Sequence, residues 1–246
     1  MSLSASVAER PRQHFPAASR QNRERIRELV QVAHDGDSPF KISAVHQAAE
    51  RAEASTLLAR RYAWRGYSVQ PLESAPLGCV TLSATTDQMT VATITANPDG
   101  DEGLYVEHLY PEVVRSIRDS GGKLCEFIRF AVDESVRSLS LLGAIFHVAC
   151  MYVMEVHGCT DALIEVNPRH VRFYEQMLGF TRADEERLDP AVNAPAVLLR
   201  LDLRHSAREI ERLGGRRKAA RRERSFYPYF FACEEAEAIV RLLKRH

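Results

Sequence analysis

The segment 122–134, GKLCEFIRFAVDE, limits most strongly what this chain can fold into, because it combines an apolar run with two charged residues. Its apolar residues are aliphatic or aromatic, a glycine pair lies at its start and acidic residues follow it, which predicts a buried strand. Glu126 and Arg129 interrupt this strand. Ionised groups in a protein core are costly unless they are paired or hydrogen-bonded, so the chain must either pair these two residues or use them.

The spacing of Glu126 and Arg129 sets a geometric condition on any shared role. In a regular strand, residues three positions apart point to opposite faces of the sheet. The two side chains can therefore serve one site only if a β-bulge inserts an extra residue between them. The alternative is a structural ion pair, formed between the two residues or across neighbouring strands, and the sequence leaves both interpretations open.

Apolar periodicity and turn residues predict alternating strands and helices along the rest of the chain. The predicted strands are 40–45, 79–83, 89–95, 162–166 and 196–203, and the predicted helices are 47–64, one from Pro111, 135–157, and one opened by Asn167 and Pro168. The apolar run 141–154 is shorter than the ~20 residues needed to cross a bilayer, so we expect a buried helix there. His147 lies in its middle and is expected to be a core histidine with one hydrogen-bonded ring nitrogen.

Length and composition indicate one domain with appendages, because 246 residues, 45% of them hydrophobic, can bury one sizeable core. We expect a flexible N-terminal extension over 1–38 with a helical piece near 23–33, a core domain over 39–204, and a basic linker with a C-terminal helical tail over 205–246. The 33 basic and 33 acidic residues balance, which excludes the overall positive field of nucleic-acid-binding proteins. The five cysteines form no CxxC pair or zinc-ligand pattern, so we expect a reduced cytoplasmic setting and no metal site.

The order of elements and the segment 167–180, NPRHVRFYEQMLGF, resemble the GCN5-related N-acyltransferase fold. Members of that family have an Asn at a strand end, a helix with a Tyr close to the thioester sulfur, and a Gly-Phe pair; here one extra residue separates Tyr174 from Gly179-Phe180. The resemblance implies an α+β fold (α/β three-layer) with a mixed, mostly antiparallel sheet flanked by helices, so that 39–204 is the acyltransferase domain. It also implies Tyr174 as the residue that protonates the leaving thiolate.

The loop before the long helix bears on the acyl donor. Acetyl-CoA-dependent members of the fold have a glycine-containing loop there, whose backbone N–H groups approach a pyrophosphate closely. This chain has DESVRSLSLLGA over 133–144, in which Arg137 offers a basic residue but no glycine occurs before Gly143. A donor carried on the phosphopantetheine arm of a protein has a single phosphodiester and does not need that loop, so the sequence favours such a donor.

The pattern Glu126-Phe127-Ile128-Arg129-Phe130 resembles the Glu-x-x-Arg-Phe pattern of acyl-homoserine lactone (autoinducer) synthases. More of the chain resembles the bacterial long-chain N-acyl amino acid synthases of the FeeM type. The resembling blocks are RRYAWRGY (60–67), GLYVEHLYPE (103–112), KLCEFIRFAVD (123–133), PRHVRFYEQMLGF (168–180), NAPAVLLRLDL (193–203) and SFYPYFF (225–231). The resemblance implies transfer of a long-chain fatty acyl group from acyl carrier protein to the amine of an amino acid, with no bound cofactor.

The chemistry of such a transfer suggests roles for the charged residues of the strand. The ammonium group of an amino acid must lose a proton before its nitrogen attacks a thioester, and Glu126 is the candidate general base. A backbone N–H of the same strand is the candidate donor to the tetrahedral oxyanion, and Arg129 could hold the substrate carboxylate bidentately. An arginine paired directly with Glu126 would lower the pKa of that carboxyl and weaken the base, so the assignment requires Arg129 to act elsewhere.

The resemblance places further residues around the substrate and the carrier. Arg61 and Trp64 fall where related synthases shape the substrate site, and an exposed helix face explains them almost as well. Glu107 falls where the relatives often have an acidic residue before a tyrosine, and a solvated loop acid explains it at least as well. The residues expected to bind the carrier protein or its phosphopantetheine arm are Arg137, Arg115 and Lys123. Two other functions stay open: an acetyl-CoA-dependent N-acetyltransferase, which the missing glycines disfavour, and a non-catalytic acyl-binding domain of the same fold.

Overall fold

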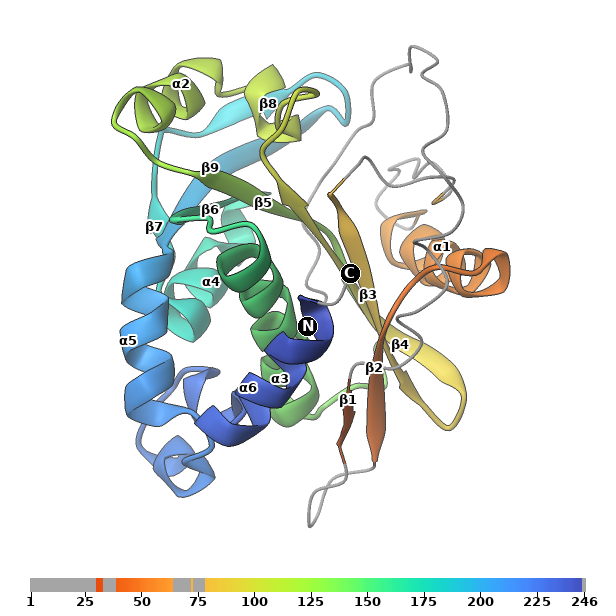
Figure 1. The fold of residues 1–246 in the computed structure, drawn as a ribbon. Helices are drawn as coiled ribbons and strands as arrows, with labels where there is room; N and C mark the ends of the chain where they lie inside the picture. Colours follow the sequence, from red (N-terminus) through yellow and green to blue (C-terminus); the bar gives the residue numbers. More distant parts are fainter. Residues whose placement is uncertain (1–29, 33–38, 64–71, 73–77, 245–246) are drawn as a thin grey trace.

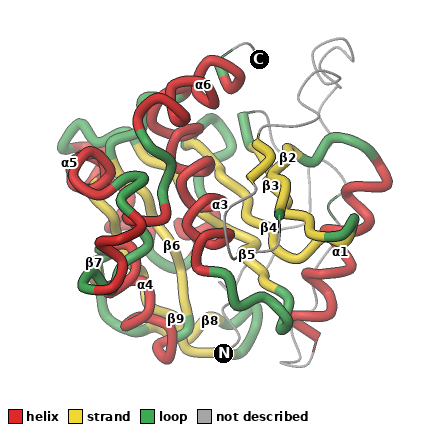
Figure 2. The backbone as a smooth tube through the Cα atoms, turned by 90° about the horizontal axis from the view of Figure 1, so that it is seen from below, coloured by secondary structure: helices red, strands yellow, loops and turns green. Residues whose placement is uncertain are grey.

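The computed structural model describes residues 30–32, 39–63, 72 and 78–244, which form one large sheet with helices on both faces (Figures 1 and 2). The strands are β1 (Val30–Val32), β2 (Phe40–Ala44), β3 (Val80–Thr86), β4 (Met89–Pro98), β5 (Leu124–Val132), β6 (Asp161–Val166), β7 (Thr181–Arg182), β8 (Arg187–Asp189) and β9 (Ala194–Asp202). Their order is β1-β2-β3-β4-β5-β6-β9-β7, and β8 also pairs with β9. Neighbouring strands are antiparallel except for β5 and β6, which are parallel. The expected mixed, mostly antiparallel sheet is confirmed.

Helices form the outer two layers of the fold. They are α1 (Ala48–Ala63), the 3₁₀ helix η2 (Tyr105–His108), α2 (Pro111–Asp119), α3 (Leu139–Met151) with its π-helical continuation η3 (Tyr152–Val156), η4 (Pro168–His170), α4 (Val171–Leu178), α5 (Leu203–Leu213), η5 (Arg217–Arg221), η6 (Tyr227–Tyr229) and α6 (Cys233–Leu243). Helix α1 packs against β4 and β5, and α3 packs against β3 and β4 from the other side (Figure 2). Each face of the sheet thus buries its own apolar cluster.

A β-bulge gives β5 an irregular alternation. Two residues of β4 that are two positions apart pair with residues of β5 that are three positions apart: Thr95 with Ile128, and Thr93 with Ala131. The bulge begins at Arg129, whose backbone has a φ of 53°, in the left-handed region. A site shared by Glu126 and Arg129 required a bulge between them, and the structure has this bulge.

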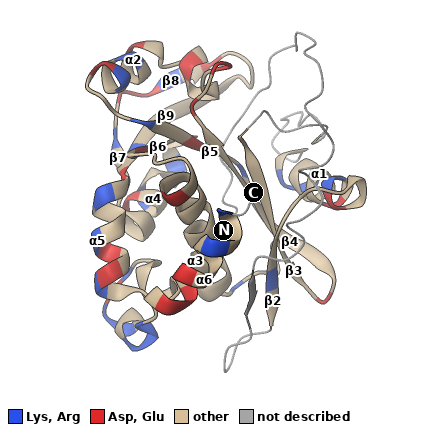
Figure 3. Cartoon of the chain, in the orientation of Figure 1, with Lys and Arg blue, Asp and Glu red and all other residues tan. Residues whose placement is uncertain are grey.

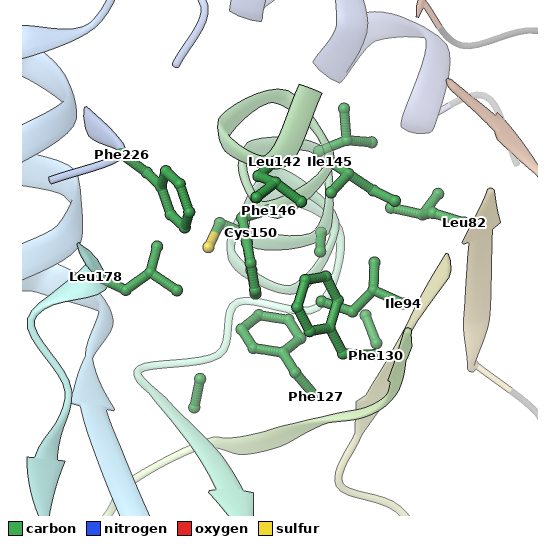
Figure 4. Close-up of a cluster of buried hydrophobic side chains, with 14 of the residues drawn as sticks. Leu82, Ile94, Phe127, Phe130, Leu142, Ile145, Phe146, Cys150, Leu178 and Phe226 are labelled. Atoms are coloured by element: carbon green, nitrogen blue, oxygen red, sulfur yellow. The ribbon is translucent and has the colours of Figure 1, made fainter. Parts of the chain in front are cut away.

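The bulge keeps the aromatic side chains of β5 on one side. Phe127 and Phe130 both point from β5 towards α3, where the ring centroid of Phe130 lies 4.7 Å from that of Phe146 (Figure 4). Leu124 and Ala131 belong instead to the clusters beneath α2 and α1 on the other face. The alternation along β5 therefore assigns each of its side chains to one layer or the other.

Strands β5 and β6 pair only at their starts. Their parallel register covers Leu124–Glu126 of β5 and Asp161–Leu163 of β6. Beyond this register β5 continues to Val132 and β6 to Val166, so the two strands diverge. Glu126 stands at the point where the sheet opens.

The apolar helix α3 lies at the centre of the main core. The stretch Leu139–Val156 is apolar and long enough to cross a membrane by composition, but 72% of it is buried within the protein. The predicted buried helix is thus confirmed, although it starts later than the predicted residue 135. The reason is a cap: the Ser138 hydroxyl accepts a hydrogen bond from the backbone N–H of Leu141 at 3.1 Å, which defines the first turn.

C-terminal residues complete the core around α3. Phe226 stacks against Phe146, and the backbone N–H of Phe231 donates to Nδ1 of His147 at 2.9 Å. Burial lowers the pKa of His147 to about 3, so His147 is the neutral core histidine that the sequence predicts. Within 205–246, expected to be a linker and helical tail, the structure has most of α5 together with η5, η6 and α6.

One expectation for the N-terminal region is wrong. Residues 30–32 form β1, antiparallel to β2, where the sequence suggested a helical piece near 23–33. β-Branched valines favour a strand, and the free edge of β2 supplies the hydrogen bonds that a helical interpretation overlooks. The rest of the expected flexible extension, 1–29 and 33–38, lies outside the described residues.

Gly143 of α3 supplies a test of how the C-terminal segment packs. A Cβ atom at this position would lie 2.8 Å from Cβ of Tyr229 and 3.3 Å from the carbonyl oxygen of Phe226. We expect Gly143→Ala to lower the free energy of unfolding by ~1–3 kcal/mol because the segment must move away, although Ala favours a helix interior over Gly by about 1 kcal/mol. Denaturant unfolding measures the change. Gly100→Ala, where a Cβ meets open space, is the control and should change stability by less than about 0.5 kcal/mol; equal stability of both variants would contradict the packing.

Candidate active site

Glu126 is fully buried on the face of the sheet that α2 and η2 cover. Its carboxylate accepts three hydrogen bonds: from Nδ2 of Asn97 at 2.7 Å, and from the backbone N–H groups of Tyr105 at 2.8 Å and Val106 at 3.1 Å. Asn97 is the register partner of Glu126 on β4, whereas the other two donors come from η2. Neutral donors therefore hold the carboxylate, and a direct ion pair with Arg129 does not.

The pKa of Glu126 is raised to about 7 from an ordinary value of 4.5. The largest cause is burial, which removes the hydration of the charged form, and the charge of Glu107 raises the pKa by a smaller amount. The hydrogen bonds from Tyr105, Asn97 and Val106 act in the opposite direction because they favour the ionised carboxylate. A carboxyl group that titrates near neutral pH can both accept and release a proton, which suits a general base.

A thiol supports the amide that holds Glu126. The Cys79 thiol donates to Oδ1 of Asn97 at 2.6 Å, and Nδ2 of the same amide donates to Glu126. This arrangement fixes which way the amide faces, because its oxygen must accept and its nitrogen must donate. Burial, together with the charge of Glu126, raises the pKa of the Cys79 thiol well above its usual range, so the thiol keeps its proton and remains a donor.

Glu107 fixes the loop that carries η2. Its carboxylate accepts from the backbone N–H of Leu104 at 2.7 Å and from the guanidinium of Arg118 at 2.6 and 2.9 Å. Arg118 also pairs with Asp99 at 2.7 Å, which ties α2 to the end of β4. Glu107 and Arg118 line an open depression of about 460 Å³, together with residues 99–103. The expected substrate contact of Glu107 stays a prediction.

A second buried acid lies on the same face as Glu126. Glu165 of β6 follows Leu163, the register partner of Glu126, by two residues, so it points to the same side. Burial, with the charges of Asp189 and Glu126, raises the pKa of Glu165 to about 8. His108 of η2 and Asp189 of β8 lie beside it. The sequence analysis missed this cluster, although an acid inside an otherwise apolar strand was the same signal that marked Glu126.

Arg129 is 5% exposed and begins the bulge of β5. Burial lowers its pKa to about 10, so the guanidinium remains charged at neutral pH. A non-glycine residue in the left-handed region costs ~1–3 kcal/mol, and such strain gathers at ligand-binding and catalytic sites. The bulge therefore places a strained cation three residues along the strand from a carboxyl that titrates near neutral pH.

Tyr174 lies in the main core, on the face of the sheet opposite to Glu126. It is 2% exposed, and its ring packs edge-on against Phe173 and Phe180. Burial raises the pKa of its phenol well above the usual range, so the hydroxyl keeps its proton at neutral pH. The expected Asn167 cap on the preceding turn is confirmed, because Oδ1 of Asn167 accepts from the backbone N–H of Arg169. The catalytic role of Tyr174 stays a prediction.

The end of α1 is tied to the end of β5. Arg61, expected to bind substrate, is 4% exposed and pairs with Glu134, while Arg60 pairs with Asp133. These ion pairs attach α1 to the loop that leads into α3. Trp64, the other substrate residue expected here, lies outside the described residues.

The three cations expected to meet the carrier do not form one site. Arg115 and Lys123 are exposed near the start of β5, and Arg137 is exposed beyond its end. The nine residues of β5 span about 30 Å at ~3.3 Å per residue, so one phosphate cannot contact both ends. Acidic and basic residues are mixed over surface helices such as α2 and α5 (Figure 3), consistent with the balanced net charge.

Comparison with known proteins identifies relatives that share this fold. The model of the family described as "N-acyl amino acid synthase FeeM" matches residues 53–202, more than half of the chain. The structure of FeeM, an N-acyl amino acid synthase from uncultured soil microbes, has a TM-score of 0.61 at 27% identity and covers 68% of this chain and 92% of its own. No curated protein sequence matches the chain.

Two further structures share the architecture at lower identity. The AHL synthase LasI has a TM-score of 0.50 at 15% identity and covers 68% of this chain and 91% of its own. Escherichia coli ElaA has a TM-score of 0.50 at 10% identity and covers 66% of this chain and 99% of its own. These likenesses confirm the expected acyltransferase fold, and the family match confirms the expected enzyme class. The chain is an acyltransferase that belongs to the FeeM family of N-acyl amino acid synthases.

Proposed function

We propose that this enzyme transfers a long-chain fatty acyl group from the phosphopantetheine thioester of acyl carrier protein to the amine of an amino acid, in the bacterial cytoplasm and without a bound cofactor. The observation that carries the proposal is the buried Glu126 carboxyl, whose pKa is about 7, at the point where β5 and β6 diverge. The similarity to FeeM, named an N-acyl amino acid synthase, supports the class of product.

Glu126 has the capacity to accept the proton of the substrate ammonium. A carboxylate offers about four acceptor positions, and three N–H groups use three of them. The remaining position can take the proton directly or through one water molecule. The free amine then attacks the thioester carbonyl carbon, a C–N bond forms, and the C–S bond breaks. The leaving thiolate needs a proton, which the buried Tyr174 hydroxyl would supply across the opening of the sheet, and the second proton that the attacking nitrogen loses as the amide forms would restore the tyrosine.

The proposed carrier-bound donor is supported by the loop before α3. Residues 133–138 contain no glycine. Three backbone N–H groups in the loop and the first turn of α3 already have acceptors: that of Ser135 donates to the side chain of Asp133, that of Val136 to the carbonyl of Asp133, and that of Leu141 to Ser138. A single phosphodiester needs fewer donors, and the proposal gives the exposed Arg137 the role of supplying charge beside it.

Replacing the proposed base gives the first functional test. Glu126→Gln removes the basic carboxylate, so we expect kcat to fall ~10²- to 10⁴-fold at neutral pH. The variant should also lose ~1–3 kcal/mol of stability, because the Gln amide nitrogen must face one of the three N–H donors. Activity is therefore measured per folded molecule, with amino acid and acyl carrier protein as substrates.

The pH profile and a second variant separate chemistry from stability. Wild-type kcat/KM should rise with pH through about 7, as Glu126 loses its proton, and this limb should disappear in Glu126→Gln. Asp161→Asn removes another buried acid, paired with Arg200, and should reduce stability without reducing turnover per folded molecule. Normal turnover by folded Glu126→Gln would show that Glu126 has a structural role in the strand and is not the general base.

Arg129→Lys tests recognition of the amino acid carboxylate. Lysine keeps the charge but loses the planar fork that binds a carboxylate bidentately. We expect the KM for the amino acid to rise ~10- to 100-fold, in line with losing ~1.5–3 kcal/mol of a charge-assisted hydrogen bond, while the KM for the acyl donor stays constant. Steady-state kinetics with each substrate varied in turn measures both. An unchanged amino acid KM would assign Arg129 a purely structural role.

The donor is tested by comparing carrier-bound and CoA-bound acyl groups. Each buried CH₂ contributes ~0.8 kcal/mol, so C12 to C18 acyl carrier protein should exceed acetyl-CoA in kcat/KM by more than ~100-fold. Arg137→Ala should lower kcat/KM for acyl carrier protein several-fold, and most strongly at low salt, because the carrier is acidic. Arg172→Ala, at another exposed arginine, is the control. Equal use of acetyl-CoA would instead indicate an ordinary N-acetyltransferase.

A further inference from the structure

Three potential ligands converge beside the candidate active site from separate elements. His108 comes from η2, Glu165 from β6 and Asp189 from β8. Each offers one ligand atom, and these atoms all lie within 4.8 Å of one another. Within the described part of the chain, no other group of three or more His, Cys, Asp or Glu residues meets this condition. The proposed acyl transfer assigns none of these three residues a role.

Two oxygens of the cluster require a partner that the described protein does not provide. Glu165 is 5% exposed and Asp189 is 0% exposed. Within the described residues, Oε1 of Glu165 and Oδ2 of Asp189 are buried and accept no hydrogen bond. A buried carboxylate oxygen without a donor is costly, so each of these atoms favours a bound proton or a bound cation, and one cation could serve both.

The imidazole of His108 is oriented as a metal ligand. Its Nδ1 lies 2.5 Å from the carbonyl oxygen of Tyr105, and a carbonyl only accepts, so Nδ1 carries the hydrogen. In the neutral ring, Nε2 then carries no hydrogen and has a free lone pair; it lies 3.4 Å from Oδ1 of Asp189. Metal-binding histidines usually donate their other N–H to a carbonyl or carboxylate in this way. The backbone N–H of Ala191 likewise supports Asp189, donating to its Oδ1 at 2.9 Å.

The spacing of two of the ligand atoms fits a small metal ion. Zinc holds nitrogen and oxygen ligands at ~2.1 Å, so two ligands of a tetrahedral ion lie about 3.4 Å apart. The distance between Nε2 of His108 and Oδ1 of Asp189 is 3.4 Å. One histidine with two carboxylates suits zinc, manganese or cobalt better than magnesium or calcium, which prefer oxygen ligands alone. The side chain of His108 is 26% exposed, which leaves one side of the cluster open to an entering ion.

We propose that His108, Glu165 and Asp189 form a structural binding site for one divalent transition-metal ion, in place of the expectation of no metal site; the ion takes no part in the acyl-transfer chemistry. The ion would join η2 to β6 and β8. Because η2 carries the N–H donors of Tyr105 and Val106, the ion would help to position the segment that holds Glu126. The binding site itself does not depend on acyl transfer, so its test uses metal binding as the readout.

The test is titration of the purified full-length protein with Co²⁺ and Zn²⁺ after removal of metal by a chelator. We expect one equivalent to bind, with visible absorption bands of nitrogen- and oxygen-bound Co²⁺ and without the near-ultraviolet band of thiolate-bound Co²⁺. Asp189→Asn and His108→Gln should each weaken binding more than about 100-fold, since loss even of an outer-shell partner costs 10- to 100-fold. Glu186→Gln, at an exposed acid near Asp189, should leave binding unchanged.

Circular dichroism establishes that each variant is folded, and the partly exposed His108 is the position least sensitive to substitution. The proposal is overturned if the folded wild type binds no stoichiometric metal, or if folded His108→Gln binds as tightly as wild type. A thiolate band that persists in His108→Gln would assign the metal to cysteines such as the exposed Cys233 and would equally overturn it. Zinc should also raise the Tm of the wild type and leave that of folded Asp189→Asn unchanged.

Discussion

The burial of the Glu126 carboxylate beneath η2 is the interaction on which the rest of the site depends. Water does not hydrate this group, so the amide of Asn97 and the backbone N–H groups of Tyr105 and Val106 replace it. These donors require η2 to lie directly over the start of the opening between β5 and β6. Arg118 of α2 in turn binds Asp99, which follows β4, and Glu107 of η2. The site around the buried charge on β5 therefore joins β4, β5, η2 and α2.

The same carboxylate is subject to two opposing effects. Burial favours its neutral form, whereas the three N–H donors favour its ionised form, and the balance is a pKa of about 7. A direct ion pair with Arg129 would lower the pKa of Glu126 and make its carboxylate a weaker base. The strained bulge keeps the guanidinium in the strand without making it the partner of Glu126. Apolar burial in the core around α3 offsets part of the cost of this strain and of the buried charges.

Long, strongly patterned elements were predictable from the sequence, and short ones were not. The strand β5, the buried helix α3 and the cap at Asn167 follow from alternation, apolar length and local hydrogen bonding. β1, β7 and β8 each have two or three residues, and they are strands only because β2 or β9 supplies their hydrogen bonds. The C-terminal aromatic residues belonged to a recognisable block, but their place against α3 required the fold.

The sequence by itself determined that Glu126 and Arg129 are charges in a buried strand, and it indicated the family, because alternation and motif spacing are local properties. The tertiary structure alone decided what surrounds them. It placed Tyr174 on the other face of the sheet, and it brought the His108 cluster together from η2, β6 and β8. The physical reason is that these contacts join residues far apart in the chain, whose distances depend on strand order, on the bulge and on where β5 and β6 diverge.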